Sequence, residues 1–316
     1  MRVRSLIAVI AAGLVVVALG SAGGSAIPAG NLVKSAGVEA QPATASTAEQ
    51  AATYSPRGWE RASVRGPGEP ERPDSGFVVA RYGTHGYFPS SAVARAIGGG
   101  RNFLFGGYPH RSATATQSIN VSSSAADIDA GGVKACLSGY LGGTRNWADY
   151  TIRVDVSFLT EAEASRGGGL RIGPVFPAQR KNETTMLRRA AERNVPSGTR
   201  LLRVVVTANS SAGSPIYAYA DNISVALTKG SCEPVLAVRC AGGALVATVT
   251  PSAVARTQRV GFAVRGAKGS KQLARARAPY SARITMAGLT GRLIVTATVT
   301  QVGSGPIVLT KKSRRC

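Results

Sequence analysis

The sequence predicts an all-β protein made of two β-sandwiches, one of them a jelly roll. Apolar residues recur at every second position in many short segments, which is the period of a half-buried strand. The chain contains 38 glycines and 16 prolines, and these residues are typical of turns between antiparallel strands. Its 316 residues exceed what one small core usually takes, so two domains are expected.

The clearest strand is predicted at residues 150–158, where polar and apolar residues alternate without a break. The same period recurs in four further segments, at 119–121, 133–137, 202–206 and 223–227. Residues 182–194 differ, because their apolar residues have the spacing of a short helix.

The first 26 residues predict an export signal. Two arginines precede an apolar run of residues 6–19, and small residues stand just before Ile27. A run of this length is shorter than the roughly 20 residues of a membrane-spanning helix. We therefore expect a secreted, extracellular protein that begins near Ile27 and keeps no transmembrane anchor.

Positive charge is concentrated in residues 229–316. The whole chain has a net charge of +22, and this segment has 15 basic residues against one acidic residue, Glu233. Such a segment would attract anionic cell-wall polymers, lipid headgroups or nucleic acid, or it reflects the arginine-rich usage of a high-GC genome. Sequence-specific nucleic-acid binding is disfavoured, because Phe262 and Tyr280 are the only aromatic residues there.

Residues 229–316 predict a small immunoglobulin-like sandwich, although the tryptophan of antibody domains is absent. Short alternating segments predict its strands, at 236–240, 245–249, 260–264, 293–299 and 307–309.

The four cysteines predict disulfide bonds, because an even number in an exported chain favours pairing. Three pairings are possible. We prefer Cys240 with Cys316, since Cys240 is in phase with the inward-facing residues of its strand. That choice leaves Cys136 with Cys232, a bond that would attach the second domain to the first.

Residues 40–75 lack a sustained period and predict a loop-rich segment. Trp59 is the exception. A tryptophan here is either a plug in the core or a platform for a sugar ring, and the core role is the more common one.

Residues 27–228 resemble the galactose-binding-domain-like sandwiches, a group that includes many carbohydrate-binding modules and secreted bacterial proteins. Residues 31–39 and 217–227 match the first and last strands of that fold. Further segments match it in order, at 77–89, 98–103, 106–108, 115–119, 128–143 and 195–200. Ser35–Val38 depart from the tighter turn of the relatives. The resemblance also makes residues 182–194 a strand and loop.

The resemblance implies a structural calcium site. In similar modules an acidic residue of the first strand and an aspartate of the last strand share a calcium ion, and Glu39 and Asp221 occupy these positions. Calcium prefers hard oxygen ligands of this kind. Alternatively, both carboxylates accept hydrogen bonds from neighbouring main-chain amides.

Tyr140 and Trp147 are the preferred ligand-binding pair, with Asp149 and Arg101 as polar candidates. The two rings flank a glycine-containing turn, which would place them near a sheet edge, where aromatic rings can contact sugars. Packing in the core is the alternative role for each ring.

The sequence predicts no catalytic centre. His85 and His110 stand in glycine- and proline-containing loops without a nucleophile or metal-site spacing. Acidic pairs such as Glu161 and Glu163 suit solvated surface charge better than two carboxyl groups opposed across a cleft. We expect a non-catalytic binding protein for carbohydrate or another cell-envelope ligand. The alternative is a structural or adhesion protein that its basic segment holds to anionic polymers.

Overall fold

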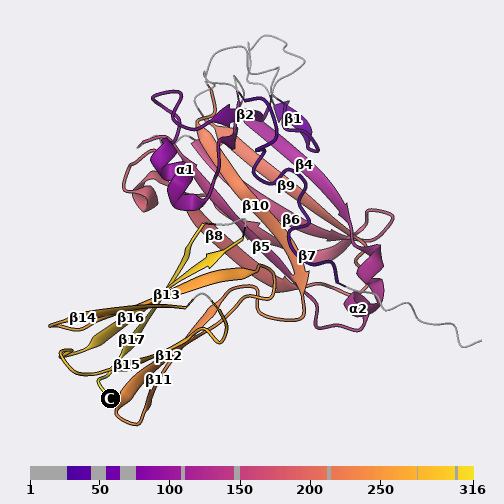
Figure 1. Ribbon diagram of the computed structural model, residues 1–316. Helices are drawn as coiled ribbons and strands as arrows, with labels where there is room; N and C mark the ends of the chain where they lie inside the picture. The colour runs from indigo at the N-terminus through magenta and orange to yellow at the C-terminus, as the bar shows by residue number, and fades with distance from the viewer. Residues whose placement is uncertain are drawn as a thin grey trace, which may run out of the picture.

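The computed structural model describes residues 27–43, 55–64, 76–107, 111–145, 150–211, 215–275, 277–302 and 305–316. The predicted export signal, Trp147 and Asp149 lie outside these residues. The described chain is all-β, as predicted, and forms two sandwiches that meet at one side (Figure 1).

The first sandwich consists of two five-stranded antiparallel sheets in a jelly-roll arrangement. One sheet has the order β1 (Glu60–Val64), β4 (Ser112–Asn120), β9 (Leu201–Ser210), β6 (Tyr150–Leu159) and β7 (Ser165–Ile172). The other has the order β2 (Val78–Arg81), β3 (Asn102–Phe105), β10 (Ala218–Thr228), β5 (Lys134–Gly143) and β8 (Thr185–Asn194). Short helical segments lie between strands, namely α1 (Ser91–Ile97), η2 (Ser122–Ser124), α2 (Ala125–Asp129) and η3 (Pro177–Arg180).

An aromatic cluster fills one end of the first core. Phe103 and Phe105 are fully buried, and the ring of Phe88 meets that of Phe103 edge-on at 5.3 Å between centroids. Tyr219 packs against the same rings. Trp59 is 7% exposed and belongs to this core. Its ring therefore fills the core and does not form a platform for a sugar.

The segment 31–36 lies beside β10, as the match of first and last strands implied. The Leu32 amide donates to the Val225 carbonyl at 2.8 Å, and Asn31 bonds the main chain of Ile223 and Val225. The segment is not a regular strand, because the chain turns at Ser35 and Val38, whose φ angles are 51° and 49°.

Residues 185–194 form strand β8, so the helical interpretation of this stretch is wrong. β8 pairs with β5 from Thr185–Gly143 to Asn194–Lys134 and forms an edge of its sheet. An edge strand keeps one side in water and can therefore carry a charged sequence without clear alternation.

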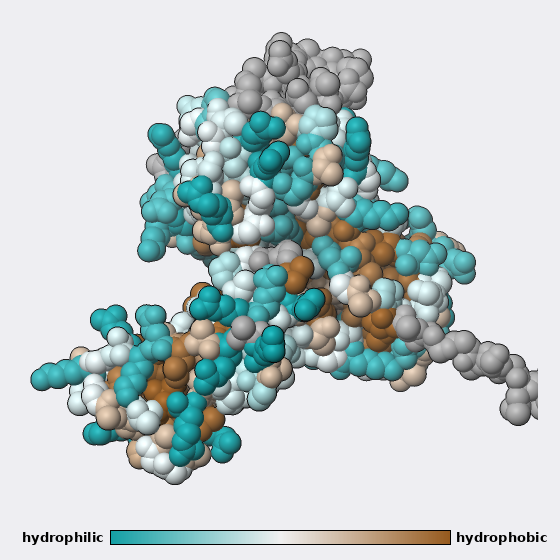
Figure 2. All heavy atoms as spheres, viewed as in Figure 1, coloured by the Kyte–Doolittle hydropathy of each residue, from teal (hydrophilic) through white to brown (hydrophobic). Residues whose placement is uncertain are grey.

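The second sandwich has a three-stranded and a four-stranded sheet and its own core. The three-stranded sheet has the order β11 (Val235–Ala241), β12 (Ala244–Thr250) and β15 (Ser281–Thr285). The four-stranded sheet has the order β14 (Ser270–Arg275), β13 (Thr257–Arg265), β16 (Leu293–Gln301) and β17 (Ile307–Ser313). Phe262 and Tyr280 are the aromatic residues among its mainly aliphatic buried side chains. Figure 2 shows hydrophilic residues along the margins of its visible face, around a hydrophobic area in the middle.

Two disulfides are present, and they are the two pairs preferred from the sequence. Cys240 bonds to Cys316 and thereby joins β11 to the segment after β17. Cys136 bonds to Cys232 and joins β5 of the first sandwich to the segment that leads into the second. The Cα–Cα distance is 5.5 Å in each.

Candidate functional site: a cavity between the sandwiches

The outer face of the β8–β5–β10 sheet forms the floor of a cavity. Alternation along β5 turns Cys136, Ser138 and Tyr140 to this face. Antiparallel register then places Arg188 of β8 opposite Tyr140, and Ser224 of β10 opposite Ser138. Polar side chains of three strands therefore meet on one face.

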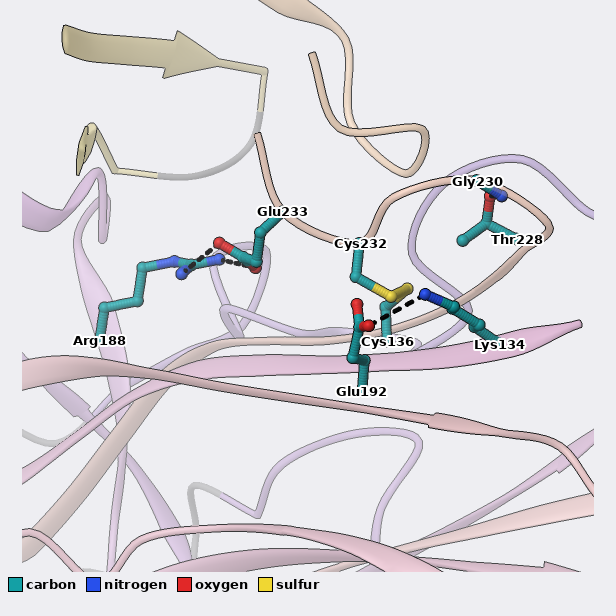
Figure 3. The surroundings of a disulfide bond; sticks show 8 residues. All are labelled: Lys134, Cys136, Arg188, Glu192, Thr228, Gly230, Cys232 and Glu233. Carbon is teal, nitrogen blue, oxygen red and sulfur yellow. Dashed lines mark hydrogen bonds and ion pairs between the residues drawn. A yellow bond between two sulfur atoms is a disulfide. The ribbon is translucent and has the colours of Figure 1, made fainter. Parts of the chain in front are cut away.

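The second sandwich is fastened over this floor, and we call the contact region the seam. The Cys136–Cys232 disulfide crosses it (Figure 3). Beside it, Arg188 donates two hydrogen bonds to the Glu233 carboxylate at 2.7 and 2.9 Å. A two-pronged pair of this kind fixes orientation as well as distance. The linker therefore holds the second sandwich in a defined position.

The cavity at the seam has a volume of about 490 Å³, within the usual range of small-ligand sites. Its floor is formed by the side chains named above. Its walls come from Gly30, Asn31 and Ala36, from Asn222 of β10, and from the second sandwich, including Arg256 and Gln301. Amide, hydroxyl, guanidinium and carboxylate groups thus surround one space.

Tyr140 is the aromatic side chain among the described residues that line the cavity. It is 6% exposed, and burial raises the pKa of its hydroxyl, so it stays protonated. Gly305 of the second sandwich lies so close to the Tyr140 hydroxyl that a side chain at position 305 would collide with it. The ring is therefore held from both sandwiches.

The predicted ligand residues do not all meet at this cavity. Tyr140 lines it, whereas Arg101 is an exposed residue before β3 and is absent from its lining. Trp147 and Asp149 fall outside the described residues. Sequence reasoning missed Arg188 and Glu233. If residues 185–194 are interpreted as a strand, alternation places Arg188 on the same face as Ala190.

Glu39 and Asp221, the predicted calcium ligands, both lie against the Gly99–Gly100 pair. A side chain at Gly99 would collide with Asp221, and one at Gly100 would collide with Glu39. Glu39 accepts hydrogen bonds from the main-chain amides of Arg101 at 2.7 Å and Asn102 at 3.1 Å. The amide bonding weighed as the alternative is therefore present for Glu39.

Asp221 is 1% exposed and accepts hydrogen bonds from the Tyr82 hydroxyl at 2.7 Å and the Asn222 amide at 2.6 Å. Burial, reinforced by the charge of Glu39, raises the pKa of the Asp221 carboxyl well above its ordinary value. The Asn102 Oδ1 atom is a further buried oxygen without a partner. These hard oxygen donors fit the chemistry of calcium.

Other metal and membrane features are sparse in the described part of the chain. No group of three or more histidine, cysteine, aspartate or glutamate side chains could hold a metal ion there. Within the same residues, no helix has the length and apolar character needed to cross a membrane. Any metal bound by Glu39 and Asp221 would therefore need carbonyl or amide oxygens as well.

No protein-family model matches the sequence, and no curated protein matches it either. Among solved structures, the chain is similar to the enzymatically active domain of bacteriophage CBA120 tailspike protein 4, with 13% identity and a TM-score of 0.38 over 63% of this chain and 21% of that one. It is also similar to the CBM22-1–CBM22-2 tandem of Paenibacillus barcinonensis Xyn10C, with 10% identity and a TM-score of 0.33 over 91% of both chains. The FN1–FN3 domains of chicken CNTN1 give 12% identity and a TM-score of 0.21 over 52% of this chain and 56% of that one. The chain thus spans about a fifth of the tailspike chain and about half of the CNTN1 domains.

Proposed function

We propose that the protein is a secreted, non-catalytic binding protein that recognises a carbohydrate in the cavity at the seam. The observation that carries the proposal is the composition of this cavity. It combines amide, hydroxyl and guanidinium groups from several chain segments beside the buried Tyr140 side chain. Groups of this kind bond the hydroxyls of sugars, whereas Tyr140, at 6% exposed, leaves no ring face free for stacking.

The cavity lining provides one carboxylate, which supports binding rather than catalysis. Glu233 is the acidic residue among the described residues lining the cavity, and Arg188 bonds both of its oxygens. A glycosidase uses two carboxyl groups, one of which must change protonation state. A single carboxylate held by a guanidinium is suited to orienting a hydroxyl group.

The two disulfides support the proposed location outside the cell, because such bonds persist in oxidising compartments. A calcium ion bound by Glu39 and Asp221 is part of the proposal. It would offset the cost of ionising the buried Asp221 and fix residues 38–41 against the strand β3. Calcium there would have a structural role, since these residues do not line the cavity.

A second candidate function rests on charge. Residues 234–316 contain 14 basic residues and no aspartate or glutamate. The protein would then be a structural or adhesion protein of the cell envelope, retained by anionic polymers and without a small ligand.

Blocking the cavity tests the first proposal. Ser224→Phe places a ring on the floor without removing a charged group, whereas Ser157→Phe places the same ring on the outer face of the opposite sheet, in β6. Binding to soluble xylan, mannan, galactan and glucan is measured by affinity electrophoresis and calorimetry. We expect one of them to bind the parent and Ser157→Phe, and about tenfold or more weaker binding by Ser224→Phe.

Two results would overturn the carbohydrate proposal. The first is an absence of binding to every neutral polysaccharide. The second is binding that Ser224→Phe leaves unchanged, because the ligand would then occupy another part of the molecule. A melting temperature for each variant separates a blocked cavity from a damaged fold.

A further inference from the structure

Basic residues of the second sandwich gather at the end that lies away from the seam. β13 runs from the seam to Arg265, and register places Arg265 beside Ile294 at the start of β16. Ile294 is in turn beside Lys312 at the end of β17. Leu293 at the start of β16 pairs with Ser313, three residues before the last residue of the chain. The C-terminus therefore lies at the same end, as Figure 1 shows.

We define this distal end by six exposed basic residues from the turns and strand ends that meet there. They are Arg265, Lys268, Arg292, Lys312, Arg314 and Arg315. Lys268 belongs to the group because its main chain bridges to Thr290, just before Arg292. Residues remote in sequence thus form one cationic surface.

No acidic side chain balances this surface. Residues 234–316 contain no aspartate or glutamate, and none of the ion pairs found in the described residues includes a residue of the distal end. In the first sandwich, by contrast, Arg200 pairs with Asp129 and Arg203 with Glu163, each at 2.6 Å. The positive potential of the distal end is therefore uncompensated locally.

The arrangement suits an extended ligand with repeated negative charges. Arg265 and Lys312 lie on strands separated by β16, so about 10 Å of sheet separates their main chains. The six residues are spread over several strand ends and turns, so a ligand with repeated charges contacts more of them at once than a single phosphate or carboxylate does. Base stacking has no platform, because Phe262 and Tyr280 are 2% and 8% exposed. The described residues of this sandwich also expose no aromatic ring for a membrane interface.

We propose that the distal end binds a linear anionic polysaccharide, and that Arg265, Arg292 and Lys312 contact its charged groups. This inference rests on the second candidate function, and it assigns the attraction of the basic sandwich for anionic polymers to one end of the molecule. It is independent of the cavity at the seam, which lies at the opposite end of β13 and β16.

A matched pair of variants tests the placement. Arg265→Gln/Arg292→Gln removes two charges from the distal end. Arg259→Gln/Arg277→Gln removes two from exposed arginines elsewhere on the same sandwich, so the net charges are equal. Binding of full-length mature protein to sodium polygalacturonate is measured at low and high salt. A neutral dextran, an oligothymidylate and anionic phospholipid vesicles are compared at the same ionic strength.

We expect the parent to bind polygalacturonate in a salt-sensitive way, the distal variant to bind about tenfold more weakly, and the other variant to change by less than about twofold. Equal losses in both variants would overturn the distal placement while leaving the charge-based second candidate standing. Absence of binding by the parent would overturn both. Tighter binding to oligothymidylate or vesicles than to polygalacturonate would overturn the polymer class.

Discussion

The two sandwiches are stabilised in different ways. The first has a cluster of buried aromatic rings around Phe103 and Tyr219, and ion pairs on its surface. The second buries Phe262 and Tyr280 as its aromatic residues, has a disulfide near each end, and exposes unbalanced positive charge. A small core leaves less apolar burial per residue, so crosslinks contribute more of the stability. The second sandwich thus combines a small, crosslinked core with a basic surface that carries no balancing acidic residues.

Loss of one aromatic side chain from each core gives the largest expected effects. Phe103→Ala and Phe262→Ala each remove a fully buried ring and should cost about 3–5 kcal/mol of unfolding free energy. Scanning calorimetry should show a lowered transition for the first sandwich and a lost transition for the second. Phe176→Ala is the control, because Phe176 is 48% exposed. Equal damage to both sandwiches by either change would contradict the comparison.

Removal of the Cys240–Cys316 bond should act on the second sandwich alone. The double change to serine opens a crosslink with a sequence separation of 76 residues and should cost about 2–5 kcal/mol. Its calorimetric transition should fall while that of the first sandwich stays in place. The matched change of Cys136 and Cys232 should instead loosen the seam, detected as a larger radius of gyration in X-ray scattering.

Asp221 gives the first sandwich a specific pH dependence. Between its ordinary pKa of 3.8 and its raised pKa in the fold, the folded state holds a proton that the unfolded state has lost. The free energy of unfolding therefore falls as pH rises through this window, by about 1.4 kcal/mol for each pKa unit of displacement. Asp221→Asn should remove this component from urea titrations at several pH values. A parent protein with the same profile as Asp221→Asn would contradict a raised pKa.

Calcium would reverse that trend in the parent protein. A bound cation favours the ionised carboxylate, so added calcium should raise the melting temperature near neutral pH, and a chelator should lower it. Glu39→Gln and Asp221→Asn should both abolish the shift. An equal melting temperature with calcium and with chelator would argue against the ion.

The ion pair at the seam should have the smallest effect on stability. Arg188 and Glu233 are partly exposed, at 24% and 38% of their side chains, so Arg188→Leu should cost about 1 kcal/mol or less. Lys134→Gln breaks the more exposed pair with Glu192 and serves as the control. A double-mutant cycle of Arg188→Leu with Glu233→Gln measures the coupling, and the corresponding cycle of Lys134→Gln with Glu192→Gln gives the control value. Coupling as weak as that of the control would show that the disulfide alone holds the seam.

Local patterns in the sequence predicted most of the fold. Strict alternation at 150–158 corresponds to β6, since one face of that strand packs on the core and the other meets water. The short, basic segments 270–275 and 281–285 were missed, although they form β14 and β15. β14 is an edge strand with mostly exposed side chains, so its sequence lacks the alternation of apolar and polar residues that predicts a half-buried strand.

The all-β class, the preferred cysteine pairs and the concentration of charge in residues 229–316 can be derived from the sequence, because these depend on local period, phase and composition. The folded chain was needed to show that Tyr140 meets Arg188 and Glu233 at a cavity, and that Arg265, Arg292 and Lys312 share one end. Such contacts depend on strand register and on how two sandwiches dock. Neither is encoded in the spacing of residues along the chain, since both arise from packing between segments far apart in sequence.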